Sequence, residues 1–219
     1  MAVRDFMTRK VVYVSPETTV AHAADVMREQ GLRRLPVIEN DKLVGIVTAG
    51  TMAENSPSKA TSLSIYEMNY LLNKTKIRDI TIKDVVTVSP FASVEDAIYL
   101  MMTHKVGVLP VEENGVVSGI ITDKDVFRTF LEVSGYGEEG VRVRILADDS
   151  VGVLEKIVST IAKEGLNIRR TVIAGAKHGQ VVNEIQIDGK VDIADLKAKL
   201  EAAGLTVDDI QETHAKALF

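Results

Sequence analysis

The sequence of 219 residues contains no cysteine, which excludes disulfide bonds, zinc sites built on thiolates and a cysteine nucleophile. Its four histidines lie far apart and show no metal-ligand spacing. The motifs of serine hydrolases, P-loop nucleotide hydrolases and HExxH metalloproteases are also missing. We interpret the acids Asp123, Asp148 and Asp149 as helix caps or solvated turns. We therefore expect no catalytic residue and no metal site.

Long apolar runs and one-sided charge are missing as well. No apolar run approaches the roughly 20 residues needed to span a bilayer, and the start "MAVRDFMTRK" lacks the apolar core of a signal peptide. The 31 acidic and 26 basic residues are interspersed, with a formal net charge of -5. This mixture does not favour nucleic acids or anionic membranes as partners. We expect a soluble, cytoplasmic protein that binds neither.

What the sequence does contain is a tandem repeat. Residues 11–37 align without a gap on residues 85–111, and the similarity continues to Thr48 and Thr122 at the same offset of 74 residues. Each copy predicts the order β-α-β-β-α, with a short first strand that ends at a Ser-Pro pair. The predicted strands lie at 11–14, 35–39 and 43–47 in the first copy and at 85–88, 109–113 and 116–121 in the second. A second helix should begin at each threonine.

The segment between the copies, residues 53–76, predicts a helix. Ser64 and Glu67 have the spacing of a capping box. One apolar stripe follows, made of Ile65, Met68, Leu71 and Leu72. We expect this helix to pack on the tandem pair, and a helix that binds a partner is the alternative.

The pattern changes after residues 132–140, whose three glycines predict a linker. The alternating strand "VRVRILA" is followed by a helix that ends at Gly165 and by two strands that turn at Lys177-His178-Gly179. A second helix, which ends at Gly204, and a last strand complete the segment. This order, β-α-β-β-α-β, is the ferredoxin-like arrangement, so the fold class of the whole chain is α/β (α+β).

The paired "LPV" strands, each followed by a G-I-x-T sequence, resemble a tandem of CBS domains, or Bateman module, over about residues 1 to 132. The resemblance implies two repeats packed about a pseudo-twofold axis, with clefts that commonly bind adenine nucleotides or related adenosyl compounds. It implies a sensor rather than a catalyst. We therefore expect no cofactor, and a ligand that is AMP, ADP, ATP or S-adenosylmethionine.

The last segment resembles an ACT domain in its loop Asp148-Asp149-Ser150-Val151-Gly152 and in Asn167. The resemblance implies a site for an amino acid or a similar effector, bordered by Asp148, Val151, Gly152 and Asn167. Val151 stands where the family typically has proline. The whole order is similar to the acetoin utilization protein AcuB family, which implies regulation of an unknown target protein. Both domain types imply a homodimer.

These patterns give the expected domain boundaries. They are 1–52 for the first CBS repeat, 53–76 for the connecting segment, 77–132 for the second CBS repeat, 133–139 for the linker, 140–213 for the ACT domain and 214–219 for a C-terminal tail.

Thr122 and Asp125 have two interpretations. Their spacing is that of a capping box, which needs no ligand. A helix N-terminus can also bind a phosphate, while a carboxylate accepts two hydrogen bonds from a ribose diol. The CBS resemblance favours binding, because these residues match nucleotide-contacting positions. The first copy has Thr48 and Thr51 and lacks the acid, so its cleft is predicted to be weaker or empty.

Arg33 and Arg34 are candidates for phosphate binding, because guanidinium groups bind phosphate through two hydrogen bonds. A solvated pair at the start of a strand is an equally good interpretation, and Lys124 is a weaker third candidate. The second copy has Gly107 at the position of Arg33, so the positive charge and the ribose acid come from different repeats. Two other functions stay open: a ligand-free dimerisation scaffold and an unrecognised nucleotide-hydrolysing enzyme.

Overall fold

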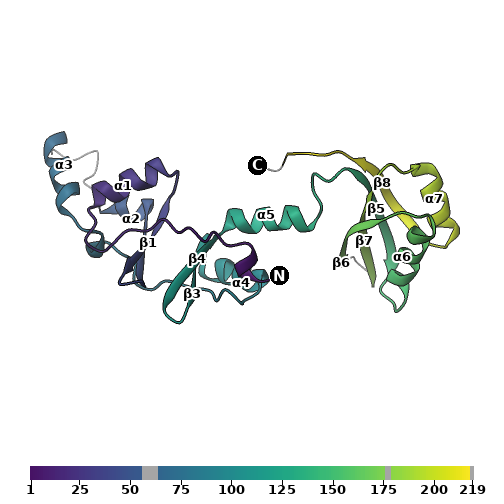
Figure 1. Ribbon diagram of the computed structural model, residues 1–219, viewed down its shortest axis with the longest axis horizontal. Helices are drawn as coiled ribbons and strands as arrows, with labels where there is room; N and C mark the ends of the chain where they lie inside the picture. Colours follow the sequence, from purple (N-terminus) through teal and green to yellow (C-terminus); the bar gives the residue numbers. More distant parts are fainter. Residues whose placement is uncertain (56–63, 176–178, 218–219) are drawn as a thin grey trace. The chain divides into compact units, whose positions relative to one another are not determined.

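The computed structural model describes residues 1–55, 64–175 and 179–217 (Figure 1). The chain divides into two compact units, Met1–Phe127 and Arg128–Phe219, and each is described by itself. No helix in the described ranges is long and apolar enough to cross a membrane. The turn predicted at Lys177 and His178 lies outside the described residues.

The first unit contains both repeats, and its element order follows the prediction. The elements are η1 (Val3–Asp5), α1 (Val20–Glu29), β1 (Arg34–Glu39), β2 (Lys42–Thr48), α2 (Ala49–Glu54), α3 (Ile65–Lys74), η2 (Ile77–Asp79), α4 (Val94–His104), β3 (Val108–Glu113), β4 (Val116–Thr122) and α5 (Asp123–Val133), which continues into the second unit.

The four strands of this unit form one antiparallel sheet in the order β1-β2-β4-β3. Each repeat contributes one hairpin, and the two hairpins have the same register, with Leu35 opposite Val47 and Leu109 opposite Ile121. Their turns contain residues with positive φ, 50° at Asn40 in the first and 83° at Gly115 in the second. These angles match the predicted Asn-Asp and Asn-Gly turns.

The strand predicted at the start of each repeat is shorter than expected. It is a single parallel bridge, between Val14 and Val37 in the first repeat and between Val88 and Val111 in the second. The Val14 N–H donates to the Pro36 carbonyl oxygen at 3.0 Å, and the Ile38 N–H donates to the Val14 carbonyl oxygen at 2.9 Å. The Ser-Pro pair follows at once, and proline has no N–H with which to continue the ladder.

The segment that precedes each repeat packs on the other repeat. Val3 is fully buried in the core of the second repeat, whereas Ile77 and Ile80 are buried in the core of the first. Two isolated antiparallel bridges fix the crossings, Thr8 with Ile120 on β4 and Ile82 with Ile46 on β2. The hydrophobic cores of the two repeats are therefore completed by each other's leading segments.

The glycine of each G-I-x-T sequence lies where a leading segment crosses the sheet. A Cβ atom at Gly45 would lie 2.0 Å from Thr81 Cγ2 and 2.6 Å from the Ile82 carbonyl oxygen. A Cβ atom at Gly119 would lie 2.5 Å from Met7 Sδ. Real Cβ atoms do not approach so closely, so a side chain at Gly45 would clash with the backbone, whereas one at Gly119 would require the Met7 side chain to move.

Helix α3 begins at the predicted capping box. The Ser64 N–H and hydroxyl donate to Glu67 Oε2 at 2.8 and 2.7 Å, and these bonds lower the pKa of Glu67. Leu72 packs against the core of the first repeat, as expected for a helix that covers the pair, while Leu71 is 40% exposed. The side chains of Ile65 and Met68 lie outside the described residues.

The second unit has the predicted ferredoxin-like order. Its elements are β5 (Gly140–Asp148), α6 (Val153–Lys163), β6 (Ile168–Gly175), β7 (Gln180–Asp188), α7 (Ile193–Ala202) and β8 (Thr206–Thr213). The sheet order is β6-β7-β5-β8, with antiparallel neighbours throughout. Both helices bury apolar side chains on one face of this sheet, where Ile145, Ile157 and Leu196 belong to the same core.

Candidate functional site

Thr122 and Asp125 form a capping box at the start of α5. Asp125 Oδ2 accepts hydrogen bonds from the Thr122 N–H at 2.8 Å and from the Thr122 hydroxyl at 2.7 Å. The Asp125 N–H donates to Thr122 Oγ1 at 3.3 Å. The capping interpretation is therefore realised in the structure. It does not conflict with ligand binding, because both side chains are only partly buried.

The first repeat builds the same cap without an acid. At the start of α2 the Thr48 N–H donates to Thr51 Oγ1 at 2.9 Å, and the Thr51 N–H donates to Thr48 Oγ1 at 3.0 Å. The Thr51 hydroxyl donates in turn to the Thr48 carbonyl oxygen at 2.9 Å. A neutral threonine thus satisfies the helix start in this fold. The negative charge of Asp125 is more than the cap requires.

Arg34 of the first repeat reaches the start of the second repeat's α5. A Cβ atom at Gly107 would lie 3.4 Å from Arg34 Nη1 and 2.7 Å from Asp123 Oδ2. The Arg34 guanidinium and the Asp123 carboxylate therefore both border the space over Gly107. The Asp123 N–H also donates to the Gly107 carbonyl oxygen at 3.2 Å, which ties the helix start to β3.

Arg33 and Arg34 line an open pocket of about 370 Å³ at the first repeat, together with Thr48, Ala49 and Gly50. The Ala49 N–H donates to the Arg33 carbonyl oxygen at 2.9 Å, which repeats the contact between Asp123 and Gly107. Three of the predicted residues are thus brought together at this pocket. Thr122 and Asp125 are not among its lining residues.

Two residues of this region were not predicted as binding residues. Gly107 leaves room for the side chains of Arg34 and Asp123, and the absence of a side chain there was visible in the repeat alignment, where Gly107 faces Arg33. Asp123 was interpreted only as a cap or turn. Lys124 is exposed, and its N–H donates to Asp123 Oδ1 at 2.8 Å.

The predicted effector residues do not all lie together in one copy of the chain. Asp148 ends β5, Val151 is fully exposed in the following loop, and Gly152 takes a φ of 91° before α6. Asn167 lies at the opposite end of the sheet, where its carbonyl oxygen accepts from the Asp188 N–H at 2.9 Å. The helical crossover returns the chain to the starting end of β5, so sequence order alone did not reveal this separation.

Across residues 1–55, 64–175 and 179–217, no three His, Asp or Glu side chains are grouped so that they could hold a metal ion.

The first unit is thus a pair of repeated α/β domains with interlocked cores and a polar helix start in each copy. The CBS domain family model matches residues 3–56 and 77–132. The chain therefore belongs to the CBS domain family, whose members are in general regulatory rather than catalytic.

Relatives of known sequence match a little more than half of this chain. The chain is 38% identical over 125 residues to an inosine-5'-monophosphate dehydrogenase of Korarchaeum cryptofilum. This match covers 56% of this chain and 23% of the enzyme. It is 31% identical over 128 residues to the uncharacterized protein MJ1225 of Methanocaldococcus jannaschii, covering 58% of this chain and 46% of that protein. The chain thus spans less than half the length of either relative.

A solved structure covers a similar share of the chain. It is that of a Vibrio cholerae protein assigned to acetoin utilization (AcuB), with 29% identity and a TM-score of 0.52. The match covers 62% of this chain and 96% of that one. A relation of the CBS pair to an AcuB protein is thereby supported at the level of the fold.

Proposed function

We propose that the protein is a non-catalytic sensor that binds an adenine nucleotide or S-adenosylmethionine through its CBS pair. The observation that supports this most directly is the difference between the two helix caps. Thr51 completes the cap of α2 without charge, whereas Asp125 brings a carboxylate to the same position of α5. A carboxylate that the cap does not require is suited to accept hydrogen bonds from a ribose diol.

The neighbouring groups have roles that follow from their chemistry. Thr122 gives its hydroxyl proton to Asp125 and so holds that carboxylate in place for the ribose, and Arg34 supplies a guanidinium for the phosphates. Asp123 borders the same space over Gly107. Lys124 and Arg33 are exposed cations that can extend to a longer phosphate chain.

The first repeat is the weaker nucleoside site in this proposal. Its pocket is lined by Arg33, Arg34 and Thr48, with no carboxylate for a diol. We therefore propose one nucleotide per chain. The ligand changes the packing of the pair or the activity of a partner enzyme, because a ligand shifts an equilibrium only when it binds one arrangement better.

For the second unit we propose an ACT domain with an effector site for an amino acid or a similar small molecule. The ferredoxin-like order and the exposed loop from Asp148 to Gly152 support this. Since Asn167 lies at the other end of the sheet, a site that combines it with the loop needs a second copy of the chain. A homodimer is part of the proposal for that reason.

Thermal unfolding of the full chain tests the sensor function. AMP, ADP, ATP, S-adenosylmethionine and a set of amino acids are added separately, each well above the expected dissociation constant. A ligand at 100 times its dissociation constant stabilises the folded protein by about 2.7 kcal/mol, a shift of several degrees. Stabilisation by an adenosyl compound supports the proposal. No response to any compound favours a dimerisation scaffold, and release of phosphate from ATP favours an enzyme.

A further inference from the structure

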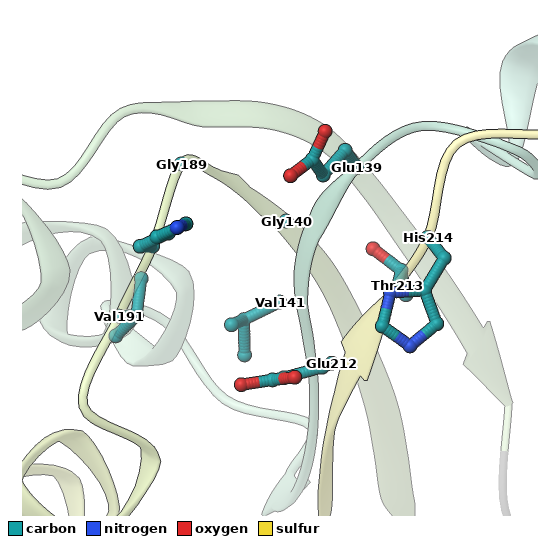
Figure 2. Close-up of a pocket in the computed structure, with 9 residues that line it drawn as sticks. Glu139, Gly140, Val141, Gly189, Val191, Glu212, Thr213 and His214 are labelled. Atoms are coloured by element: carbon teal, nitrogen blue, oxygen red, sulfur yellow. The ribbon is translucent and has the colours of Figure 1, made fainter.

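A second pocket lies in the ferredoxin-like unit, at the end of the sheet where Asn167 lies, and none of the residues assigned so far lines it. It has a volume of about 390 Å³ and is lined by the segment that enters β5, by the turn between β7 and α7 and by the end of β8 (Figure 2). Small-molecule sites occupy about 300 to 1,000 Å³. Asp148 and the effector loop lie at the opposite end of β5, roughly 26 Å away at 3.3 Å per residue.

The shape of this pocket depends on backbone positions that require glycine. Gly140 takes a φ of 148°, and a Cβ atom there would lie 2.0 Å from the Ile187 carbonyl oxygen. Gly189, in the turn between β7 and α7, has a φ of 80°. Two valines supply the apolar part of the lining. Val141 is 1% exposed, and Val191 packs at the edge of the same core.

The polar groups of the pocket have an excess of negative charge. Glu139 and Glu212 contribute two carboxylates, and Lys190 contributes one ammonium group. In the part of the chain that the structure describes, these three side chains and that of His214 make no hydrogen bond or ion pair. Figure 2 shows Glu139 and Glu212 on either side of Val141.

Several other charges of the same sheet are paired. Arg144 reaches Glu184 at 2.9 Å and Asp208 at 2.7 Å, and Arg169 reaches Asp188 at 2.8 Å. The two carboxylates at the pocket have no such partner among the described residues. They are available to a ligand that carries positive charge.

We propose that this pocket binds a small aliphatic compound with two amino groups. Each ammonium group would pair with one of the two carboxylates, and the methylene chain between them would lie over the partly exposed Val191. A metal ion is disfavoured, because the described residues include no group of three His, Asp or Glu side chains suited to one. The proposal is independent of nucleotide binding by the CBS pair.

The substitution Lys190→Gln distinguishes two kinds of compound with two amino groups, a free diamine and a diamino acid. A free diamine is repelled by its ammonium group, so Lys190→Gln strengthens diamine binding. A diamino acid such as L-lysine also presents a carboxylate to Lys190, so the same substitution weakens its binding. Comparison of the two compounds therefore identifies the source, and either result is consistent with the shared chemistry of two ammonium groups.

Isothermal titration of the full chain with 1,4-diaminobutane, 1,5-diaminopentane and L-lysine tests the proposal, with 1-aminobutane as the one-amine control. Exposed ion pairs are weak individually, so we expect Glu139→Gln and Glu212→Gln each to lower the affinity about fivefold. The matched control is Asp209→Asn, which removes one charge from β8 outside the pocket lining. Binding should also weaken with added salt.

Two results would overturn the proposal. One is the absence of heat, and of any shift of the Gly140 and Gly189 amide signals in NMR spectra, at millimolar concentrations of all three compounds. The other is equal affinity of Glu212→Gln and Asp209→Asn for a compound that binds. Thermal melting of each variant shows whether it is folded before it is titrated.

Discussion

The substitution Asp125→Thr separates the two roles of the acid at the start of α5. The first repeat already shows that threonine completes this cap, with hydrogen bonds of 2.9 and 3.0 Å between Thr48 and Thr51. The variant should therefore keep its helix start. At the cap itself, the variant loses the interaction of the acid with the positive end of the helix, which contributes about 0.3 to 1 kcal/mol. We expect this loss at the cap to lower the free energy of unfolding by less than about 1 kcal/mol.

The affinity for nucleotide should fall much more. Hydrogen bonds to charged groups contribute about 1.5 to 3 kcal/mol each, and the lower value applies at a partly exposed site. Loss of two such bonds, with about 1 kcal/mol regained by the threonine hydroxyl, leaves a net loss of about 2 kcal/mol. That corresponds to roughly 30-fold weaker binding. Calorimetric titration measures the affinity, and urea unfolding measures the stability.

The reciprocal variant, Thr51→Asp, should add a second nucleotide site, so that the stoichiometry rises from one to two per chain. Asp125→Thr with an affinity within twofold of the original protein would refute the ribose role. Destabilisation well above 1 kcal/mol would show instead that the cap needs the acid.

Four further substitutions test other parts of the structure. Arg34→Gln should weaken binding of ATP about tenfold and that of adenosine hardly at all, because a guanidinium pairs with phosphates. Gly107→Ala, whose Cβ would lie 2.7 Å from Asp123 Oδ2, should weaken binding of both ligands with little loss of stability. An affinity equal to that of the original protein in either variant would contradict a nucleotide site that includes Arg34 and Gly107. Ile77→Ala should destabilise the first unit by about 2 to 5 kcal/mol in urea unfolding, since Ile77 is fully buried. The hydrogen bond from Arg169 lowers the pKa of Asp188, so this pair stabilises the fold above the ordinary carboxylate pKa of about 4 and the contribution disappears as the pH falls; NMR titration of Arg169→Gln should show the Asp188 pKa raised toward its ordinary value.

The tandem repeat made most of the first unit predictable. Helical spacing, Asn-Asp and Asn-Gly turns and threonine caps are local signals, and they gave the hairpins and the starts of α2 and α5. The sequence predicted whole strands at Val14 and Val88, where the structure has single-residue bridges. Apolar β-branched runs predict a strand whether or not a partner strand is available.

The features that the sequence did not predict depend on contacts between residues far apart in the chain. The close contacts at Gly45 and Gly119 come from segments that belong to the other repeat, and no periodicity within one copy indicates such a crossing. Likewise, the distance of Asn167 from the effector loop is set by the path of the chain over the sheet. The approach of Arg34 to the space over Gly107 depends in the same way on how the two repeats pack, and the sequence did not predict it.

The exchange of leading segments has a consequence for how the pair responds to a ligand. Because Val3 completes one core and Ile77 the other, neither repeat can open without exposing apolar surface of its neighbour. The two repeats should therefore melt in a single transition, and a nucleotide held at only one helix start should protect the backbone amides of both repeats from hydrogen exchange. Binding of a nucleotide to one repeat should thus make both repeats more rigid.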